Sequence, residues 1–415
     1  MSSIIDPSAL SSNEPREFHD EARSVLHSLR SSLAALIASA GADPTQPQEL
    51  SRRFSLDKSL TWKVARVVRE DDPSLAVSHL PGRSGLQIFV RSLAKSGADR
   101  TAVETARESL VRLDEFIAEH AGDRETFKII LGHSTDEATR QHGEAQRKLA
   151  FRGQSAVWGV QSRVHIAAQI VAPSTNPLKL DIALMSGLID FKRLRTDVAW
   201  SMARVRNYIG DGTTNASTLL EALDTRRETG EVPLLLDLCT EPTPPMRMIP
   251  GEGETYRIEL TEGPVGKSGV ISCVAGWFYR GANSIYKTKD DLYGEHLVHV
   301  STPTELLVFD LYVHKDFAFA HHPTISVYSN LPGGQTFSPA HRDKALLPVG
   351  EQVTELGSCP PSTMVPEVPR YSRAISSAFE RLGWTDADFH GYRFRIKYPP
   401  VPSLALFRYP LADRP

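Results

Sequence analysis

The sequence predicts an α+β protein in two parts, an α-helical N-terminal domain over residues 1–150 and a β-rich mixed region over residues 151–415. Two observations carry this prediction. Apolar residues recur every three or four positions in the first part, as the buried face of a helix requires. In the second part they alternate in short runs, which is typical of strands. A composition of 40% hydrophobic and 23% charged residues is that of an ordinary globular protein.

Helical segments follow one another through the first part. The first carries apolar residues at helical spacing as far as Ile37, and Gly41 and Pro44 predict its end. Further helices are expected over residues 48–54, Lys58–Arg69, 85–96, Arg100–His120 and 123–131. The residues of the last two that should face inward are Leu110, Leu113, Ile117 and Phe127.

Strand-like runs dominate the second part. The period between Leu178 and Tyr208 is ambiguous, but clear runs cover residues 164–170, 256–260, 270–279, 306–313, 324–328 and 392–396. The alternation over 164–170 predicts a strand that is buried on one face only. One late helix is expected over Tyr371–Leu382, ending at Gly383.

Prolines punctuate this second part. The stretches 241–250 and 360–369 are expected to be loops or linkers, because proline continues neither a helix nor a central strand. The prolines at 399, 400 and 402 indicate an edge strand or an extended arm. A sub-boundary near 241–253 would divide the β-rich region again.

Charge and cysteine content limit the functional classes. A net charge of -3 argues against a uniformly basic nucleic-acid coat protein, although a local basic patch remains compatible with it. Cys239, Cys273 and Cys359 form no CxxC pair, so neither a disulfide framework nor a cysteine zinc site is expected. The polar, acidic N-terminus lacks a signal-peptide pattern, and the apolar run over 33–42 is too short to span a bilayer. We therefore expect a cytoplasmic protein without membrane association.

The strongest functional pattern lies at residues 48–69. We expect a first helix over 48–54, a turn over 55–57 and a second helix over Lys58–Arg69, capped at its N-terminus by Asp57. Between Ser51 and Glu70 there are six Lys or Arg residues and two Asp or Glu residues. Residues 1–50 contain three Lys or Arg residues and seven Asp or Glu residues. The apolar stripe of the second helix consists of Leu60, Val64, Val67 and Val68. The basic charge is therefore local, in a chain that is acidic overall.

A helix of this kind suits a DNA groove. Cations neutralise phosphates, and long donor side chains reach the base edges. The residues expected to contact DNA are Arg52, Arg53, Lys58, Ser59, Trp62, Lys63, Arg66 and Arg69.

Residues 48–69 resemble the helix-turn-helix of bacterial transcriptional regulators, including winged-helix families. Those proteins often carry the pattern L-small-R-R-apolar-G-apolar-D-K-S, and residues 50–59 read LSRRFSLDKS, with Ser55 in place of the glycine. The resemblance implies sequence-specific DNA binding with Lys58–Arg69 as the recognition helix. Because operators are often two-fold symmetric, we also expect a homodimer, with Arg100–His120 as one candidate dimer element.

Two alternatives remain open. The helical domain could instead dock a protein partner, which would make the chain a non-enzymatic scaffold. The second alternative is a nucleotide-binding hydrolase, because residues 261–268, TEGPVGKS, nearly match GxxxxGK[ST] and place Gly266, Lys267 and Ser268 at phosphate-binding positions. Against it, Thr261 replaces the first glycine, and a strand-like run follows where a helix is needed.

The histidines give no metal motif. They are His296, His299, His314, His321, His322 and His341, with Glu295, Asp316 and Asp343 nearby. Their spacing matches no metal site, so we expect no metal, no cofactor and no catalytic residue. The leading hypothesis is a DNA-binding transcriptional regulator whose C-terminal region senses a small-molecule effector or mediates assembly.

Overall fold

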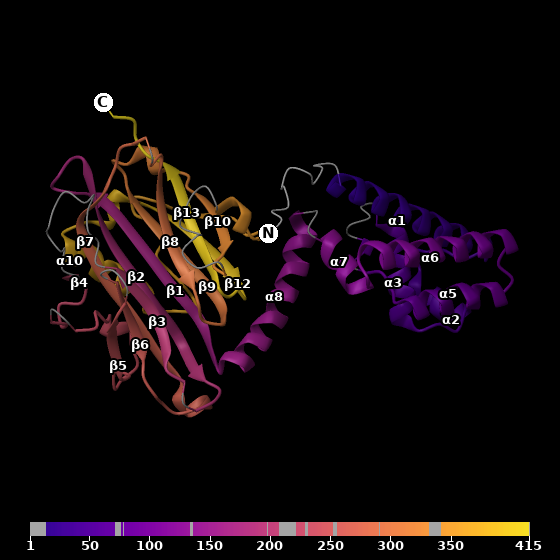
Figure 1. The fold of residues 1–415 in the computed structure, drawn as a ribbon, viewed down its shortest axis with the longest axis horizontal. Helices are drawn as coiled ribbons and strands as arrows, with labels where there is room; N and C mark the ends of the chain where they lie inside the picture. Colours follow the sequence, from indigo (N-terminus) through magenta and orange to yellow (C-terminus); the bar gives the residue numbers. More distant parts are fainter. Residues whose placement is uncertain are drawn as a thin grey trace, which may run out of the picture. The chain divides into compact units, whose positions relative to one another are not determined.

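The computed structural model describes residues 14–70, 76–77, 79–132, 136–196, 198–206, 221–228, 231–251, 255–289, 291–331 and 342–414 (Figure 1). Their contacts divide the chain into two units, Met1–His142 and Gly143–Pro415. The division falls inside helix α8 (Asp136–Trp158), a few residues before the change of sequence pattern near 151. An α-helical part is thus followed by a mixed, sheet-rich part, and the α+β prediction is confirmed.

The helices of the first unit match the predicted ones closely. They are α1 (Glu14–Ser39), α2 (Pro47–Arg53), α3 (Lys58–Arg69), α5 (Arg83–Lys95), α6 (Arg100–His120) and α7 (Arg124–Gly132). The bounds of α3 and α6 are those predicted, because Asp57 and Asp99 cap their first turns by accepting backbone N–H groups. The chain leaves α1 at Gly41, whose φ of 63° is one that glycine adopts without strain.

One continuous core holds the first unit together. The apolar side of α1, from Val25 to Ile37, packs against the apolar side of α6, and α5 and α7 close the cluster. Leu110, Leu113, Ile117 and Phe127 all lie in this core, as predicted. The apolar side of α6 is therefore buried within the unit. Val111 of α6 is a large apolar residue that lies outside this core and is exposed.

The second unit is built on sheets. Its strands and one late helix are β1 (Val160–Pro173), β2 (Lys179–Arg193), β3 (Trp200–Arg206), β4 (Glu221–Ala222), β5 (Met246–Pro250), β6 (Thr255–Leu260), β7 (Ile271–Ser284), β8 (Tyr293–Val300), β9 (Thr304–His314), β10 (Thr324–Ser329), β11 (Thr354–Ser358), α10 (Tyr371–Leu382), β12 (Phe389–Lys397) and β13 (Ser403–Pro410). Within the described residues, the large sheet has the order β11-β12-β9-β1-β2-β7-β4. Two smaller sheets have the orders β10-β13-β8 and β3-β6-β5. The ambiguous stretch after Leu178 is therefore β2 and β3.

Helix α10 and the smaller sheets cover opposite faces of the large sheet. The apolar side of α10 meets Ile166 and Ile170 of β1 in one cluster, and Ala167 and Val171 of the same strand belong to the other. The prediction that β1 is buried on one face only is therefore wrong. Its second face reads as polar because it carries His165 and Gln169, and both are buried nonetheless.

A buried ion pair fixes the position of α10. Arg393 of β12 donates two hydrogen bonds to the carboxylate of Asp310 on β9, at 2.8 and 2.7 Å. The hydroxyl groups of Tyr312 and of Tyr371, the first residue of α10, donate to the same carboxylate at 2.9 Å. Each charge thus has several partners, which a buried ion pair requires. The helix ends at Gly383, which has the left-handed conformation predicted for it.

The proline-rich segments correct two further predictions. Residues 246–250, expected to be loop, form β5, which among the described strands pairs only with β6 at the edge of its sheet, where a missing N–H donor is tolerated. The prolines around residue 400 form neither an edge strand nor an arm; they make the short connection between β12 and β13. Among the described residues no helix has both the length and the apolar content that a membrane span requires.

Candidate functional site

The turn between α2 and α3 is tightly built. After Arg53 the chain passes through Ser55, whose φ of 50° is a left-handed conformation that glycine adopts more readily than serine. The N–H of Leu56 donates to the carbonyl of Ser51 at 3.0 Å, and the Ser51 hydroxyl donates to the carbonyl of Leu56 at 2.7 Å. Asp57 then accepts the N–H of Leu60 at 3.0 Å and starts α3. The two helices are therefore joined by a specific, hydrogen-bonded turn.

Helix α3 has a buried side and an exposed side. Val64 and Val67 are buried in the core of the first unit, and Leu60 and Val68 are partly buried beside them. Thr61, which the apolar stripe did not include, is fully buried, and its hydroxyl donates back to the carbonyl of Lys58 at 3.1 Å. This back-bond satisfies the hydroxyl inside the core.

The residues predicted to contact DNA are all exposed. They are Arg52, Arg53, Lys58, Ser59, Trp62, Lys63, Arg66 and Arg69. Trp62 keeps 46% of its surface accessible, and the Arg66 guanidinium lies 5.3 Å from its ring centroid. Cation–π contact of this kind holds both side chains on the outer side of α3.

Arg53 differs from the other seven residues. Its guanidinium donates to the carbonyl oxygens of Ala40 and Gly41, at 2.7 and 2.5 Å. These are carbonyl groups at the C-terminal end of α1, where helix partners are lacking. Arg53 therefore serves the packing of the first unit, and a phosphate would have to compete with that role.

His79 lies beside the cations of α3. Its ring lies edge-on to Trp62, with the centroids 5.3 Å apart. Burial lowers the pKa of His79, and the charges of Arg66 and Lys63 lower it further against the opposing charge of Glu70. Cations disfavour the protonated imidazole, so Arg66 and Lys63 add to the effect of burial.

The predicted phosphate-loop residues lie in a short turn between β6 and β7. Gly266, Lys267 and Ser268 belong to one turn of 3₁₀ helix over Gly266–Gly269, and β7 starts two residues later at Ile271. A phosphate loop needs an α-helix whose N-terminus points at the phosphates. Here a strand follows, so the geometry offers the hydrolase alternative no phosphate cradle.

The histidines of the second unit lie in separate surroundings. His296 is buried between the Gln169 side chain and the Tyr409 hydroxyl, 2.8 Å from each. His322 pairs with Glu355 at the surface, at 2.8 Å. His341 lies outside the described residues. Within the described part of the chain, no three side chains of metal-binding type come together.

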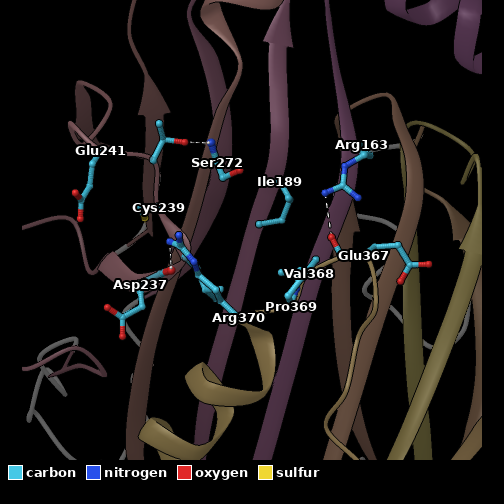
Figure 2. A pocket seen from close by; sticks show the side chains of 12 residues that line it. Arg163, Ile189, Asp237, Cys239, Glu241, Ser272, Glu367, Val368, Pro369 and Arg370 are labelled. Atoms are coloured by element: carbon cyan, nitrogen blue, oxygen red, sulfur yellow. Dashed lines mark hydrogen bonds between the residues drawn. The ribbon is translucent and has the colours of Figure 1, made fainter.

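A pocket of about 530 Å³ opens on the α10 side of the large sheet (Figure 2). Arg163 of β1 and Ile189 of β2 form its back, as Figure 2 shows. One wall is the segment 237–241, and the other is the segment 367–370 that leads into α10. Sequence reasoning missed this pocket because its residues come from distant segments, from Arg163 to Arg370. Both proline-rich loops border it, and they were the only sequence signal.

Charged residues of both signs line the pocket. Arg163 donates to the carboxylate of Asp190 at 2.5 Å and to the carbonyl of Glu367 at 3.0 Å. Arg370 reaches across and donates to the carbonyl of Asp237 at 3.2 Å. Cys239 lies buried behind them, and burial raises the pKa of its thiol, so it is a neutral thiol at pH 7. The pocket suits binding of a polar small molecule better than thiol chemistry.

Comparison of the chain with protein-family models, with curated proteins and with solved structures gives no match. The fold defines an α+β protein with an α2–turn–α3 pair in its first unit and a pocket in its second. Any function therefore has to be argued from these two features.

Proposed function

We propose that this chain is a DNA-binding transcriptional regulator, with α3 as its recognition helix. One observation carries the proposal: α3 buries Val64 and Val67 and turns Trp62, Lys63 and Arg66 outward. A groove-reading helix needs this division, since its inner side must anchor it while its outer side presents donors. The hydrogen-bonded turn after α2 supplies the fixed angle between the two helices.

The charges support DNA rather than a neutral partner. Lys58, Lys63, Arg66 and Arg69 lie along the exposed side of α3, and no ion pair within the described residues neutralises any of them. Four unpaired cations on one short helix repel each other, and a polyanion relieves that repulsion by replacing its counterions. Arg52 extends the same basic surface onto α2.

The second unit supplies the regulatory part of the proposal. A pocket of about 530 Å³ is large enough for a small effector. Assembly into a homodimer belongs to the same proposal, because two recognition helices reading two half-sites raise both affinity and specificity. Because the apolar side of α6 is already buried, we expect the dimer contact to use a different surface.

The test is binding of the full chain to a random DNA pool at low salt. The double variant Lys63→Ala, Arg66→Ala should weaken binding by roughly 1–3 kcal/mol for each base that these side chains read and should reduce its salt dependence. The control is Arg100→Ala, Arg112→Ala on α6, which removes two exposed cations away from α3 and should leave binding unchanged. If the wild-type chain retains no DNA at low salt, the proposal is wrong.

A further inference from the structure

Most charges around the pocket already have partners. Arg163 is paired with Asp190, and Glu367 accepts the guanidinium of Arg395 at 2.5 Å. Asp237 accepts Arg226 at 3.1 Å. These pairs neutralise one another, so they hold the walls in place and leave little net charge for a ligand.

Two charged groups of the pocket have no charged partner among the described residues. Arg370 uses one of its N–H groups, on the carbonyl of Asp237, and no carboxylate lies against it. Glu241 on the other wall has no hydrogen bond or ion pair within that part of the chain. One cation and one carboxylate thus remain available in the same pocket. Figure 2 shows both side chains on the side of the pocket that the segment 237–241 forms.

The position of Arg370 strengthens its attraction for a carboxylate. It is the residue directly before Tyr371, where α10 begins. The positive end of the helix dipole therefore adds to the guanidinium charge at this point. A guanidinium also binds a carboxylate with two parallel hydrogen bonds, a stronger contact than the single one it makes here with a carbonyl.

Apolar residues line the pocket beside these charges (Figure 2). Ile189, Leu238 and Val368 are buried beneath the pocket, and Pro369 lies at its edge. An aliphatic or aromatic side chain placed here would cover the exposed Pro369 and the small part of the other three side chains that water still reaches.

We propose that this pocket binds a zwitterion of the α-amino acid type, either a free amino acid or a dipeptide, with an apolar side chain. The ligand carboxylate pairs with Arg370, its ammonium group pairs with Glu241, and its side chain lies against Pro369. The inference deepens the effector-sensing part of the proposed function. The binding itself requires no DNA, so the two can fail separately.

The first experiment compares probes on the unchanged full chain by isothermal titration calorimetry. The zwitterions are L-leucine, L-phenylalanine and leucyl-leucine; N-acetyl-leucine lacks the ammonium group and leucinamide lacks the carboxylate. For ligands this small we expect a dissociation constant on the order of 0.1–1 mM for the best zwitterion. Removing either charge should weaken binding at least about tenfold, since each probe then leaves Arg370 or Glu241 unpaired. Leucine against leucyl-leucine distinguishes an amino acid from a dipeptide.

The second experiment tests the two residues. Arg370→Gln and Glu241→Gln should each weaken binding of the best zwitterion at least about tenfold. Each variant should also bring the affinity for that zwitterion closer to the affinity for the probe that lacks the matching charge. Arg373→Gln on α10 and Glu262→Gln remove exposed charges outside the pocket and serve as controls. Both pocket residues are exposed, so thermal unfolding should be unchanged in all four variants.

Three results would overturn the inference. They are no binding of any zwitterion at about 10 mM, equal binding of N-acetyl-leucine and leucine, or unchanged binding in both pocket variants. A chain that binds leucine but no DNA contradicts the proposed function alone. A chain that binds DNA but no zwitterion contradicts the pocket assignment alone.

Discussion

Ser55 has a backbone conformation that its turn requires and that a serine side chain disfavours. The turn between α2 and α3 requires a φ of 50° at this position, and a side chain makes that conformation costly. The surrounding hydrogen bonds from Ser51 and Leu56 hold the turn in place despite this cost. The fold therefore tolerates a residue that the turn itself disfavours.

Replacing Ser55 with glycine should stabilise the first unit. Glycine removes the steric cost of the positive φ but loses more backbone entropy on folding, so the net gain should be about 0.5–1 kcal/mol. The measurement is the urea midpoint of the full chain, followed by circular dichroism. The matched control is Ser59→Gly in the first turn of α3, where the backbone is right-handed and glycine should destabilise. Equal effects of the two substitutions would contradict this account of Ser55.

At the scale of elements, two adjacent arginines of α2 have different tasks. Arg53 donates to the carbonyl groups that end α1, and Arg52 makes no hydrogen bond or ion pair within the described residues. One side chain therefore joins two helices, whereas its neighbour adds only to the exposed basic surface. Sequence reasoning assigned both to DNA because composition alone does not distinguish them.

Separate measurements of folding and binding should distinguish these arginines. Arg53→Gln should cost about 1 kcal/mol of unfolding free energy, because the carbonyl groups of Ala40 and Gly41 lose their donors. Arg52→Gln should leave stability unchanged and weaken DNA binding, with a smaller salt dependence. Urea unfolding and DNA titration of the same two samples measure both effects. The assignment is wrong if Arg52→Gln is the less stable variant.

For the whole molecule, most helices could be predicted from the sequence, although α8 was not among them, and the assembly of the sheets could not be predicted. The signals that begin and end helices are local. Asp57 and Asp99 cap the first turns of α3 and α6, and Gly383 ends α10. Strand order depends on pairing between distant segments. Strand β1 pairs in parallel with β9, more than one hundred residues away, and this pairing leaves no local pattern. The pocket depends on the same assembly and was missed for the same reason.

The second face of β1 gives the whole molecule a specific response to acid. His165 and His296 are buried there, and burial lowers the pKa of each from its ordinary value to about 4. In the unfolded chain both titrate near pH 6.5. Between pH 6.5 and 4 the unfolded state therefore binds protons that the folded state does not, and stability falls as the pH falls. Above pH 6.5 both states are neutral and stability does not depend on these groups.

The slope of this response can be measured. Each histidine contributes up to about 1.4 kcal/mol per pH unit, so the two together should lower the unfolding free energy by up to about 3 kcal/mol per unit within the window. The carboxylates Asp224, Glu367 and Asp388 have lowered pKa values and lose their contribution only below about pH 4.5. Urea unfolding between pH 7.5 and 4.5, followed by tryptophan fluorescence, thus isolates the histidines. His296→Gln should lower the slope by up to about 1.4 kcal/mol per pH unit. A stability that is flat across this range would contradict the lowered pKa values of His165 and His296.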